Sequence, residues 1–343
     1  MGREPLAELN GEQRLRAQAA LRSQLFKPIE HALEEVEEAI RDLLRSDDPL
    51  VDEVATHLLR GGGKRVRAAV VLLCGSLSGE LTAYRDTLIR VAAAVEMIHM
   101  ATLIHDDIID GAETRRGLPT VNTRWNDQIG VLSGDFLFAR SFTALAQTGN
   151  NRIVQIMADV VSEMSVGEIK QLGQSFGPQT EEDYLQRIFR KTAYFISQSC
   201  RLGGVVSGLD AEAEQAVATY GHGIGMSFQI IDDILDFTGT EEEFGKPVGN
   251  DLRAGLYTLP VLYALDHARQ KEELRELLSR RSLEDADIQW IRSVLEECGA
   301  ISHAYERAAA YIEQAKAALA NFQPSPAREA LLALADFVQH RRY

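Results

Sequence analysis

Apolar residues recur three or four positions apart along most of the chain. Over residues 12–45 this stripe consists of Leu21, Leu25, Ile29, Leu33, Val36 and Ile40. The spacing predicts an amphipathic helix, which we expect to be broken near Pro28. The same pattern, with Ala-rich or apolar faces, predicts helices over 64–77, 88–110, 131–147, 152–172, 182–207, 211–237, 251–268, 284–297, 302–319 and 326–340.

Strand signals do not accompany these helices. Sustained alternation flanking an Asn-Gly or Asp-Gly turn is missing from the sequence, so we predict no hairpin. Four glycine-containing breaks interrupt the helices, and none is a linker long enough to divide domains: 61–63, 111–124, 173–181 and 238–251. We therefore predict an all-α, bundle-like chain that forms a single domain over residues 1–343.

Composition and charge exclude several classes of partner. Hydrophobic residues make up 45% of the chain and charged residues 25%, as in ordinary globular proteins. The 51 acidic and 36 basic residues give a formal net charge of −15. This balance argues against non-specific binding of nucleic acid and against attraction to an anionic membrane surface.

Signals for secretion or membrane insertion are also missing. The three cysteines form no CxxC pair, which argues against a disulfide framework or a thiolate zinc site. The first residues lack the apolar core of a signal peptide, and no run approaches the roughly 18 apolar residues of a membrane span. We expect a cytoplasmic protein without a transmembrane segment.

An acidic cluster ends the predicted helix 88–110. Asp106 and Asp110 share one face of this helix, Asp107 is adjacent, and His99 lies two turns earlier on the same side. Three carboxylates in an apolar setting repel one another unless cations neutralise them. Hard oxygen ligands favour Mg²⁺, which commonly binds carboxylates together with substrate phosphates. The alternative is a solvent-exposed helix end, although carboxylates there oppose the helix dipole.

The same DDxxD pattern ends a second apolar helix. Asp232, Asp233 and Asp236 close the predicted helix 211–237, and Gln229 lies one turn earlier on the same face. This repetition favours a functional interpretation. If the two helices face each other, six carboxylates line the mouth of one apolar cavity and hold several Mg²⁺ ions, and through them a diphosphate.

Basic residues occur where a phosphate-binding protein needs them. Gly61–Gly63 precede Lys64, Arg65 and Arg67 at a predicted helix start, where backbone N–H groups attract anions. The spacing is not that of a P-loop. Further cations lie near the acidic motifs: Arg115 and Arg116 after the first, Lys246 after the second, and Lys191-Thr192 before an apolar stretch. A solvated basic turn and an ordinary snorkelling lysine are the alternatives.

Six segments together resemble the motif series of trans-isoprenyl diphosphate synthases. In chain order they are GGGKRVR, IHDDIIDGAETRRG, SGDFLFARSF, RKTAYFIS, GMSFQIIDDILDF and GKPVGNDLRAGLYTLPVLYAL, which span residues 61–265. The later segments are most similar to the large catalytic component (component 2) of bacterial heptaprenyl diphosphate synthases. The resemblance implies an all-α isoprenoid-synthase bundle around a deep central cavity.

The resemblance also assigns site residues. It implies Mg²⁺ ligands, with about three ions per site, at Asp106, Asp107, Asp110, Asp232, Asp233 and Asp236. It places isopentenyl diphosphate on Lys64, Arg67, His99 and Arg116, and the allylic diphosphate on Arg115, Lys191, Thr192, Gln229 and Lys246. The catalytic residues that it implies are Asp106, Asp110, Asp232, Lys191 and Gln229.

The implied activity is Mg²⁺-dependent elongation of an allylic diphosphate, farnesyl or longer, by successive isopentenyl diphosphates. Short-chain members tend to carry a bulky aromatic residue five positions before the first aspartate, where this chain has Ala101, with Thr102 beside it. We therefore expect an open tunnel and a long, heptaprenyl-like product for a quinone side chain. A homodimer, or a heteromer with a small regulatory subunit, is implied, and the product then passes to a membrane.

Three other functions stay open at this point. Ala101 argues against a farnesyl- or geranylgeranyl-type short-chain synthase, although that class shares the motifs. A class I terpene cyclase has no need of the second-substrate site of Lys64, Arg67 and His99. A non-catalytic synthase subunit has no need of two intact DDxxD motifs. Leu256 stands where many short-chain synthases have a further diphosphate-binding lysine, so no cation is assigned there.

Overall fold

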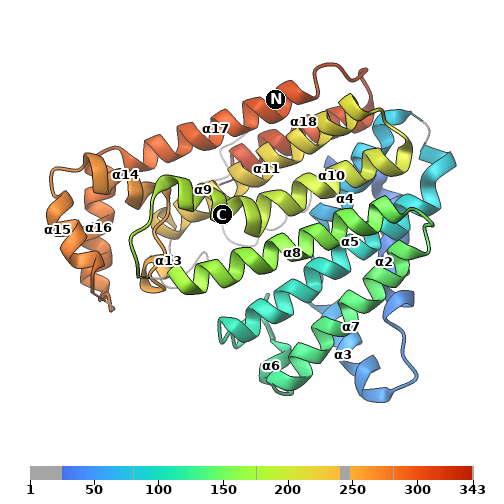
Figure 1. The fold of residues 1–343 in the computed structure, drawn as a ribbon, viewed down its shortest axis with the longest axis horizontal. Coiled ribbons are helices and arrows are strands. Elements are labelled where there is room, and N and C mark those ends of the chain that lie inside the picture. The colour runs from blue at the N-terminus through green and yellow to red at the C-terminus, as the bar shows by residue number, and fades with distance from the viewer. Residues whose placement is uncertain (1–24, 80, 175, 240–247, 281, 342–343) are drawn as a thin grey trace, which may run out of the picture. The chain divides into compact units, whose positions relative to one another are not determined.

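The structure is a computed structural model that describes residues 25–79, 81–174, 176–239, 248–280 and 282–341. These residues form helices almost throughout (Figure 1), with one pair of two-residue strands, so the all-α prediction is confirmed. The chain divides into two compact units. Unit 1 comprises Met1–Gln155, Leu202–Asp210 and Phe322–Ala333, and unit 2 comprises Ile156–Arg201, Ala211–Asn321 and Leu334–Tyr343. The single domain over residues 1–343 remains a prediction.

Unit 1 is built around one long helix, α5 (Leu81–Ile109), which packs against α2, α4 and α7. Its apolar residues from Leu88 to Ala101 are almost all buried, which explains why so hydrophobic a helix forms in a compact unit. The elements around it are η2 (Lys27–Ile29), α2 (Glu30–Leu44), α3 (Pro49–Arg60), α4 (Val66–Gly75), η3 (Ser76–Ser78), α6 (Val121–Arg124), α7 (Asp127–Ala146) and the start of α8 (Asn151–Gln174).

Two helices among the described residues are long and apolar enough to cross a membrane by length and composition alone, a test that a buried core helix also passes. They are Ala83–Ile109 and Asp127–Ala146. Neither helix needs an uninterrupted apolar run to reach this length and hydropathy, because a few polar residues leave the average hydropathy over 18 residues high. The most apolar window of the first helix is 72% buried and that of the second 33%, so the first is a core helix of unit 1.

Unit 2 centres on α11 (Ala211–Thr238), which packs along α17 (Ala300–Ala318; Figure 1). Its other elements are α9 (Glu181–Ile188), the π-helical turn η4 (Phe189–Ala193), α13 (Asn250–Arg253), α14 (Leu259–His267), α15 (Lys271–Leu278) and α16 (Asp285–Glu297). The boundary between the units falls within α8, α10 (Tyr194–Ser207) and α18 (Pro326–Gln339).

Three glycines of α11 allow its neighbours in unit 2 to approach closely. A Cβ atom on Gly225 would lie 2.4 Å from the Ala193 Cα atom in η4, and one on Gly221 would lie 2.7 Å from the Ser197 Cα atom in α10. On another side of the helix, a Cβ atom on Gly223 would lie 2.5 Å from the Tyr311 carbonyl oxygen of α17. The GHGIG segment therefore sets the distance between α11 and three neighbouring elements, η4, α10 and α17.

The helix boundaries differ from the prediction where the backbone departs from α geometry. The predicted helix 182–207 is interrupted by the π turn η4, and the predicted helix 251–268 separates into α13 and α14. A π turn inserts one residue without breaking the apolar pattern, which is why periodicity alone does not reveal it. Three helices of the described residues, α3, α6 and α15, were not predicted.

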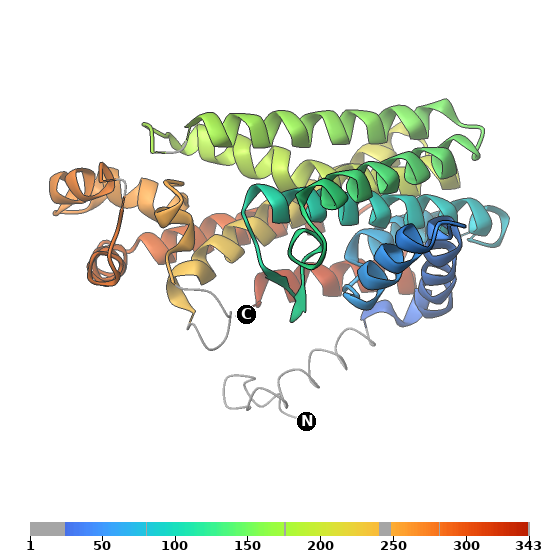
Figure 2. The ribbon, with the colours of Figure 1, turned by 90° about the horizontal axis from the view of Figure 1, so that it is seen from below.

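The prediction of no hairpin is wrong. Strands β1 (Thr114–Arg115) and β2 (Leu118–Pro119) pair antiparallel and project as a narrow ribbon after α5 (Figure 2). Both turn residues have positive φ, 53° at Arg116 and 77° at Gly117, as in the turns that match strand twist. The sequence did not reveal this hairpin because strands of two residues are too short to show an alternation of apolar and polar residues. In addition, the turn is Arg-Gly rather than Asn-Gly or Asp-Gly.

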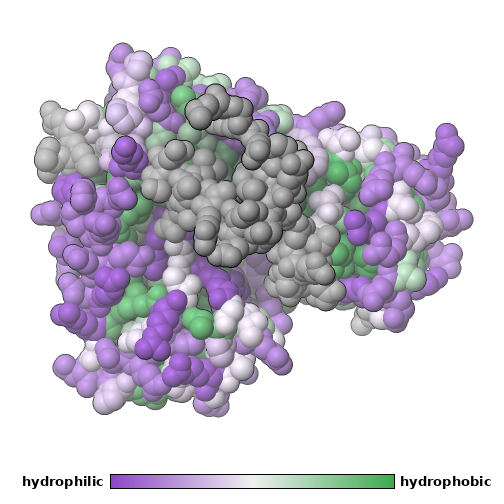
Figure 3. Space-filling view, turned by 180° about the vertical axis from the view of Figure 1, so that it is seen from behind, coloured by the Kyte–Doolittle hydropathy of each residue, from purple (hydrophilic) through white to green (hydrophobic). Residues whose placement is uncertain are grey.

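The surface agrees with the charge of the chain. On the face shown in Figure 3, hydrophilic residues predominate over the described part and hydrophobic residues form only small patches. Large hydrophobic side chains are nevertheless exposed on α7 and α8, among them Leu132 at 64% and Ile169 at 70%.

The close contact at Gly225 gives a stability prediction. Gly225→Ala forces the added methyl group against the Ala193 backbone, and we expect a loss of about 2 kcal/mol in the free energy of unfolding. Gly173→Ala in α8 is the matched control, because a Cβ atom there meets nothing within 4 Å. The control should be neutral or stabilising. Chemical denaturation measures both variants, and equal stability would contradict the packing argument.

Candidate active site

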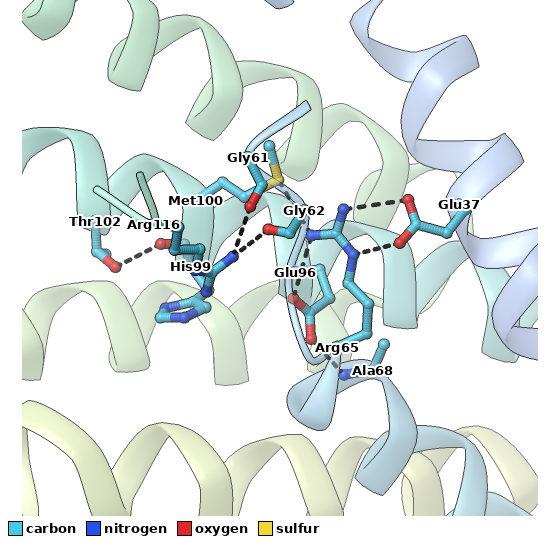
Figure 4. A network of polar contacts seen from close by, with 10 residues as sticks. All are labelled: Glu37, Gly61, Gly62, Arg65, Ala68, Glu96, His99, Met100, Thr102 and Arg116. Carbon is cyan, nitrogen blue, oxygen red and sulfur yellow. Dashed lines mark hydrogen bonds and ion pairs between the residues drawn. The ribbon is translucent and has the colours of Figure 1, made fainter. Parts of the chain in front are cut away.

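The glycine loop between α3 and α4 is held by a buried arginine (Figure 4). Arg65 has a φ of 50° and is 4% exposed. Its Nε and Nη2 atoms donate to the two carboxylate oxygens of Glu37, at 2.5 and 3.1 Å, and its Nη1 atom lies 3.8 Å from Glu96 Oε2. Arg65 is therefore a structural cation, consistent with its omission from the predicted ligand-binding residues.

Glu96 of α5 also caps the helix that begins after this loop. Its Oε1 atom accepts a hydrogen bond of 3.0 Å from the Ala68 backbone N–H in the first turn of α4. Arg65, at the N-cap of α4, makes no side-chain cap of its own. A buried carboxylate from a different helix thus accepts from one of the N–H groups that the first turn of α4 leaves without a partner within the helix. This hydrogen bond fixes the backbone position of Arg67.

Arg67, His99 and Arg116, which the sequence assigns to one substrate, lie close enough for the charges of the two arginines to act on each other and on His99. Burial and repulsion from Arg116 lower the pKa of Arg67 to about 10, although Glu96 opposes this change. Burial and four neighbouring arginines hold the pKa of His99 well below 6.5, so its ring is neutral near pH 7. Arginines this crowded favour an anionic ligand, because the ligand would relieve their mutual repulsion.

Arg116 joins the hairpin to the glycine loop. Its Nη1 atom donates to the Gly62 carbonyl and, at 3.4 Å, to the Gly61 carbonyl (Figure 4). A Cβ atom on Gly63 would lie 3.0 Å from Arg116 Nη1, so a larger residue here would press on the end of the Arg116 side chain. Lys64, the remaining predicted residue of this group, is exposed beside them.

The first acidic motif divides into one buried and two more accessible carboxylates. Asp107 is 5% exposed and forms a bidentate pair with Arg115, whose Nε atom donates to Oδ1 at 2.8 Å and to Oδ2 at 3.0 Å. Asp106 is half-buried, and Asp110 is exposed just beyond the end of α5. Asp107 is therefore paired with Arg115, whereas Asp106 and Asp110 are the two more accessible carboxylates of the motif, called the outer carboxylates below.

The hairpin that contains Arg115 and Arg116 is anchored at its base. His57 Nε2 lies 2.8 Å from the Pro119 carbonyl oxygen, and the Thr120 hydroxyl donates to the Ala112 carbonyl at 2.7 Å. A pocket of about 70 Å³ lies between α3, the end of α5 and the hairpin. His57 is a positioning residue that the sequence did not indicate, because a lone histidine in an amphipathic helix gives no distinctive signal.

The predicted chain-length residues lie on α5 one turn before the acidic motif. Ala101 is 0% exposed, and Thr102 is half-buried with its hydroxyl donating to the His99 carbonyl at 2.9 Å. Ala101 is thus part of the interior of unit 1, where a larger side chain would displace its neighbours.

The second acidic motif, in unit 2, shows the same division. Asp232 is exposed and pairs at 3.0 Å with Arg341, which follows α18. Asp233 is buried, and burial with the nearby Asp251 raises its pKa well above 3.8. Burial and Asp251 also raise the pKa of Asp236 to about 6, although the backbone N–H groups of Asn250 and Asp251 donate to its carboxylate.

Thr192, Gln229 and Asp233 form a buried chain with a residue that was not predicted. The Thr192 hydroxyl donates to Gln229 Oε1 at 2.9 Å, and Gln229 Nε2 donates to Asp233 Oδ1 at 2.9 Å. The Tyr184 hydroxyl donates to Asp233 Oδ2 at 2.7 Å. Burial and the adjacent Asp233 raise the pKa of Tyr184 well above 10, so this hydroxyl stays protonated.

Lys191 is held by a carboxylate of α8. Its Nζ atom lies 3.2 Å from Glu168 Oε2, and Gln171 donates to the other oxygen of Glu168 at 3.2 Å. The ammonium group of Lys191 is therefore paired with a specific acidic neighbour. Lys246, predicted to bind the allylic diphosphate, lies outside the described residues.

The acidic residues provide only hard oxygen donors, which suit Mg²⁺. Within the described residues, no three Asp, Glu, His or Cys side chains already converge as a set of metal ligands. Mg²⁺ commonly retains waters and completes its coordination with substrate phosphates, so such convergence is not required. The raised pKa values of Asp233 and Asp236 mark uncompensated negative charge that a divalent cation would neutralise.

Comparison with known proteins identifies the family. A sequence model of the Polyprenyl synthetase family matches residues 48–295. Heptaprenyl diphosphate synthase component 2 of Bacillus subtilis is 39% identical over 310 residues, which are 90% of this chain and 87% of that protein. Octaprenyl diphosphate synthase of Escherichia coli is 33% identical over 312 residues, with coverages of 89% and 94%.

Solved structures agree with the sequence relatives. A polyprenyl synthase from Caulobacter crescentus, crystallised with calcium and isoprenyl diphosphate, superposes with a TM-score of 0.86 at 36% identity. The match covers 94% of this chain and 98% of that one. These similarities confirm the all-α isoprenoid-synthase fold. The chain belongs to the polyprenyl synthetase family and is a trans-prenyltransferase.

Proposed function

We propose that the protein is a Mg²⁺-dependent, long-chain all-trans-polyprenyl diphosphate synthase that makes a heptaprenyl-like quinone side chain. The observation that supports this most directly is the crowding of Arg67 and Arg116, where burial and both arginines lower the pKa of the neutral His99 beside them and Arg116 donates to the glycine loop. Such a cluster suits the diphosphate of a second substrate. A terpene cyclase, which has one substrate, has no use for it.

In the proposed reaction, isopentenyl diphosphate binds to Lys64, Arg67, His99 and Arg116. The arginines neutralise its diphosphate, and the neutral imidazole of His99 offers an N–H donor without adding charge. Because Arg116 already donates to the Gly61 and Gly62 carbonyls, the loop and the hairpin would close on this substrate together.

The allylic diphosphate is proposed to bind to Arg115, Lys191, Lys246 and the outer carboxylates through metal. Asp106, Asp110, Asp232 and Asp236 would hold Mg²⁺, about three ions per site, while Asp107 and Asp233 support Arg115 and Gln229. When bound, Mg²⁺ supplies neutralisation of the charge on the departing diphosphate. Lys191 would exchange Glu168 for the substrate as the diphosphate arrives.

Chain extension then proceeds by ionisation, condensation and elimination. The allylic C–O bond breaks and its electron pair leaves with the diphosphate, which Arg115 and Lys191 stabilise. The oxygens of Thr192 and Gln229, 2.9 Å apart, are proposed to face the resulting cation. The C4 double bond of isopentenyl diphosphate attacks, and loss of a proton restores an alkene extended by five carbons. The released diphosphate is a plausible acceptor of that proton.

The long product is proposed from the small side chain of Ala101, buried beside the acidic motif of α5. The names of the relatives include both heptaprenyl and octaprenyl synthases, which agrees with a long-chain product. The designation component 2 of the Bacillus protein supports a heteromer with a small regulatory subunit, with a homodimer as the alternative. We propose a cytoplasmic enzyme that delivers its product to a membrane.

The proposed metal site is tested by Asp106→Ala. The purified chain is incubated with farnesyl diphosphate, labelled isopentenyl diphosphate and Mg²⁺, and the dephosphorylated products are sized. Loss of this outer carboxylate should lower the turnover number on the order of 10²-fold or more, because charge on the departing diphosphate is no longer neutralised.

Asp86→Ala is the matched control, since Asp86 is an exposed aspartate on the same helix outside the motif. Full activity of Asp106→Ala would contradict the metal assignment. If the wild-type chain is inactive alone, addition of a small partner subunit distinguishes an obligatory heteromer from a wrong assignment of function.

Product length is tested by enlarging the side chain at residue 101. The series Ala101→Val, Ala101→Leu and Ala101→Phe should give progressively shorter products, because each step narrows the space beside α5. The smaller substitutions keep the test valid if phenylalanine overpacks this fully buried position. Folded variants that all make a product of wild-type length would refute the tunnel hypothesis.

A further inference from the structure

A continuous hydrogen-bonded chain in unit 2 begins at a tyrosine that no motif includes. Tyr184 of α9 donates to Asp233 Oδ2 at 2.7 Å, Gln229 donates to Asp233 Oδ1 at 2.9 Å, and Thr192 donates to Gln229 Oε1 at 2.9 Å. Tyr184 is 0% exposed and Asp233 is 5% exposed. The chain therefore links α9, α11 and the π turn, and of its four side chains only that of Gln229 is half-buried rather than buried.

The direction of each hydrogen bond depends on the Asp233 carboxylate. Both Asp233 oxygens accept a hydrogen bond, one from Gln229 Nε2 and the other from the Tyr184 hydroxyl. The Gln229 amide nitrogen therefore faces Asp233, and its carbonyl oxygen faces Thr192. Because Tyr184 occupies the second oxygen, the carboxylate is also held against rotation.

The backbone places Thr192 at the other end of this chain. Thr192 belongs to the π turn η4, and the next residue, Ala193, packs directly on Gly225 of α11. Thr192 is 8% exposed, so its hydroxyl has few alternative partners in solvent. Both members of the Thr192–Gln229 pair are thus fixed, one by the turn and the other by Asp233.

We infer that Tyr184 is a positioning residue that orients the Gln229 carbonyl through Asp233. This inference rests on the proposed function, in which the oxygens of Thr192 and Gln229 face the allylic cation. Without the tyrosine hydroxyl, Asp233 can rotate and Gln229 can turn its amide N–H groups toward the cation. A positive dipole end at that point would oppose ionisation instead of assisting it. Tyr184 itself touches neither substrate.

Tyr184→Phe tests the inference, with Tyr257→Phe as the matched control. Tyr257 is also buried, and its hydroxyl donates to the Leu278 carbonyl at 3.1 Å, away from Asp233. Each variant loses one buried tyrosine hydroxyl. We expect Tyr184→Phe to lower kcat about tenfold with both KM values within about twofold, and Tyr257→Phe to leave kcat unchanged.

A double variant separates positioning from a general loss of stability. If Tyr184 acts through the Thr192–Gln229 pair, Tyr184→Phe should add little to the kcat loss caused by Thr192→Val. The inference would be overturned if the fold losses in kcat of the two single variants multiplied in the double variant. Equal kcat values for Tyr184→Phe and Tyr257→Phe would also overturn it. Unfolding midpoints of all variants show whether each remains folded.

A measurement without turnover distinguishes this inference from the proposed function. In protein labelled with ¹⁵N-glutamine, the side-chain NH₂ signal of Gln229 is assigned by its loss in Gln229→Leu. Tyr184→Phe should shift that signal and Tyr257→Phe should not, whether or not the chain elongates prenyl diphosphates. An unshifted signal refutes the orienting role, whereas inactivity of the wild-type enzyme refutes the proposed function.

Discussion

The cationic site of unit 1 depends on the Glu96 carboxylate. This one buried side chain caps α4 at the Ala68 N–H group and lies close to the Arg65 guanidinium. Without it, the first turn of α4 would lose a hydrogen-bond acceptor, and Arg65 would retain only Glu37 as an acidic partner. The start of the helix fixes the backbone at Arg67, so a residue proposed to bind substrate takes its position from a buried acid of another helix.

Both acidic motifs follow the same rule, that a carboxylate can be buried only with donors around it. Asp107 meets this condition with Arg115, and Asp233 with Tyr184 and Gln229. The neighbouring aspartates remain more accessible. The three acids of each motif are therefore of two kinds, one buried among donors within the protein and two that are more accessible.

Apolar periodicity was sufficient to predict the long helices, because burial of one face determines them. The predicted helix 211–237 and the observed α11 differ by a single residue. The π turn and the hairpin escaped prediction for the opposite reason, since local backbone geometry determines them. The motifs likewise indicated Lys191 and Gln229, whereas Glu168, Tyr184 and Asp251 become apparent only when distant helices are brought together.

Under the proposed function, the crowded arginines of unit 1 also link substrate binding to the stability of the fold. Burial and the charge of Arg116 lower the pKa of Arg67, so these cations are held together at a cost. A diphosphate that bound this cluster only in the folded chain would shift the unfolding equilibrium toward the folded state. An enzyme with substrate bound would then unfold less often than the same enzyme without substrate, and proteases would cut it more slowly.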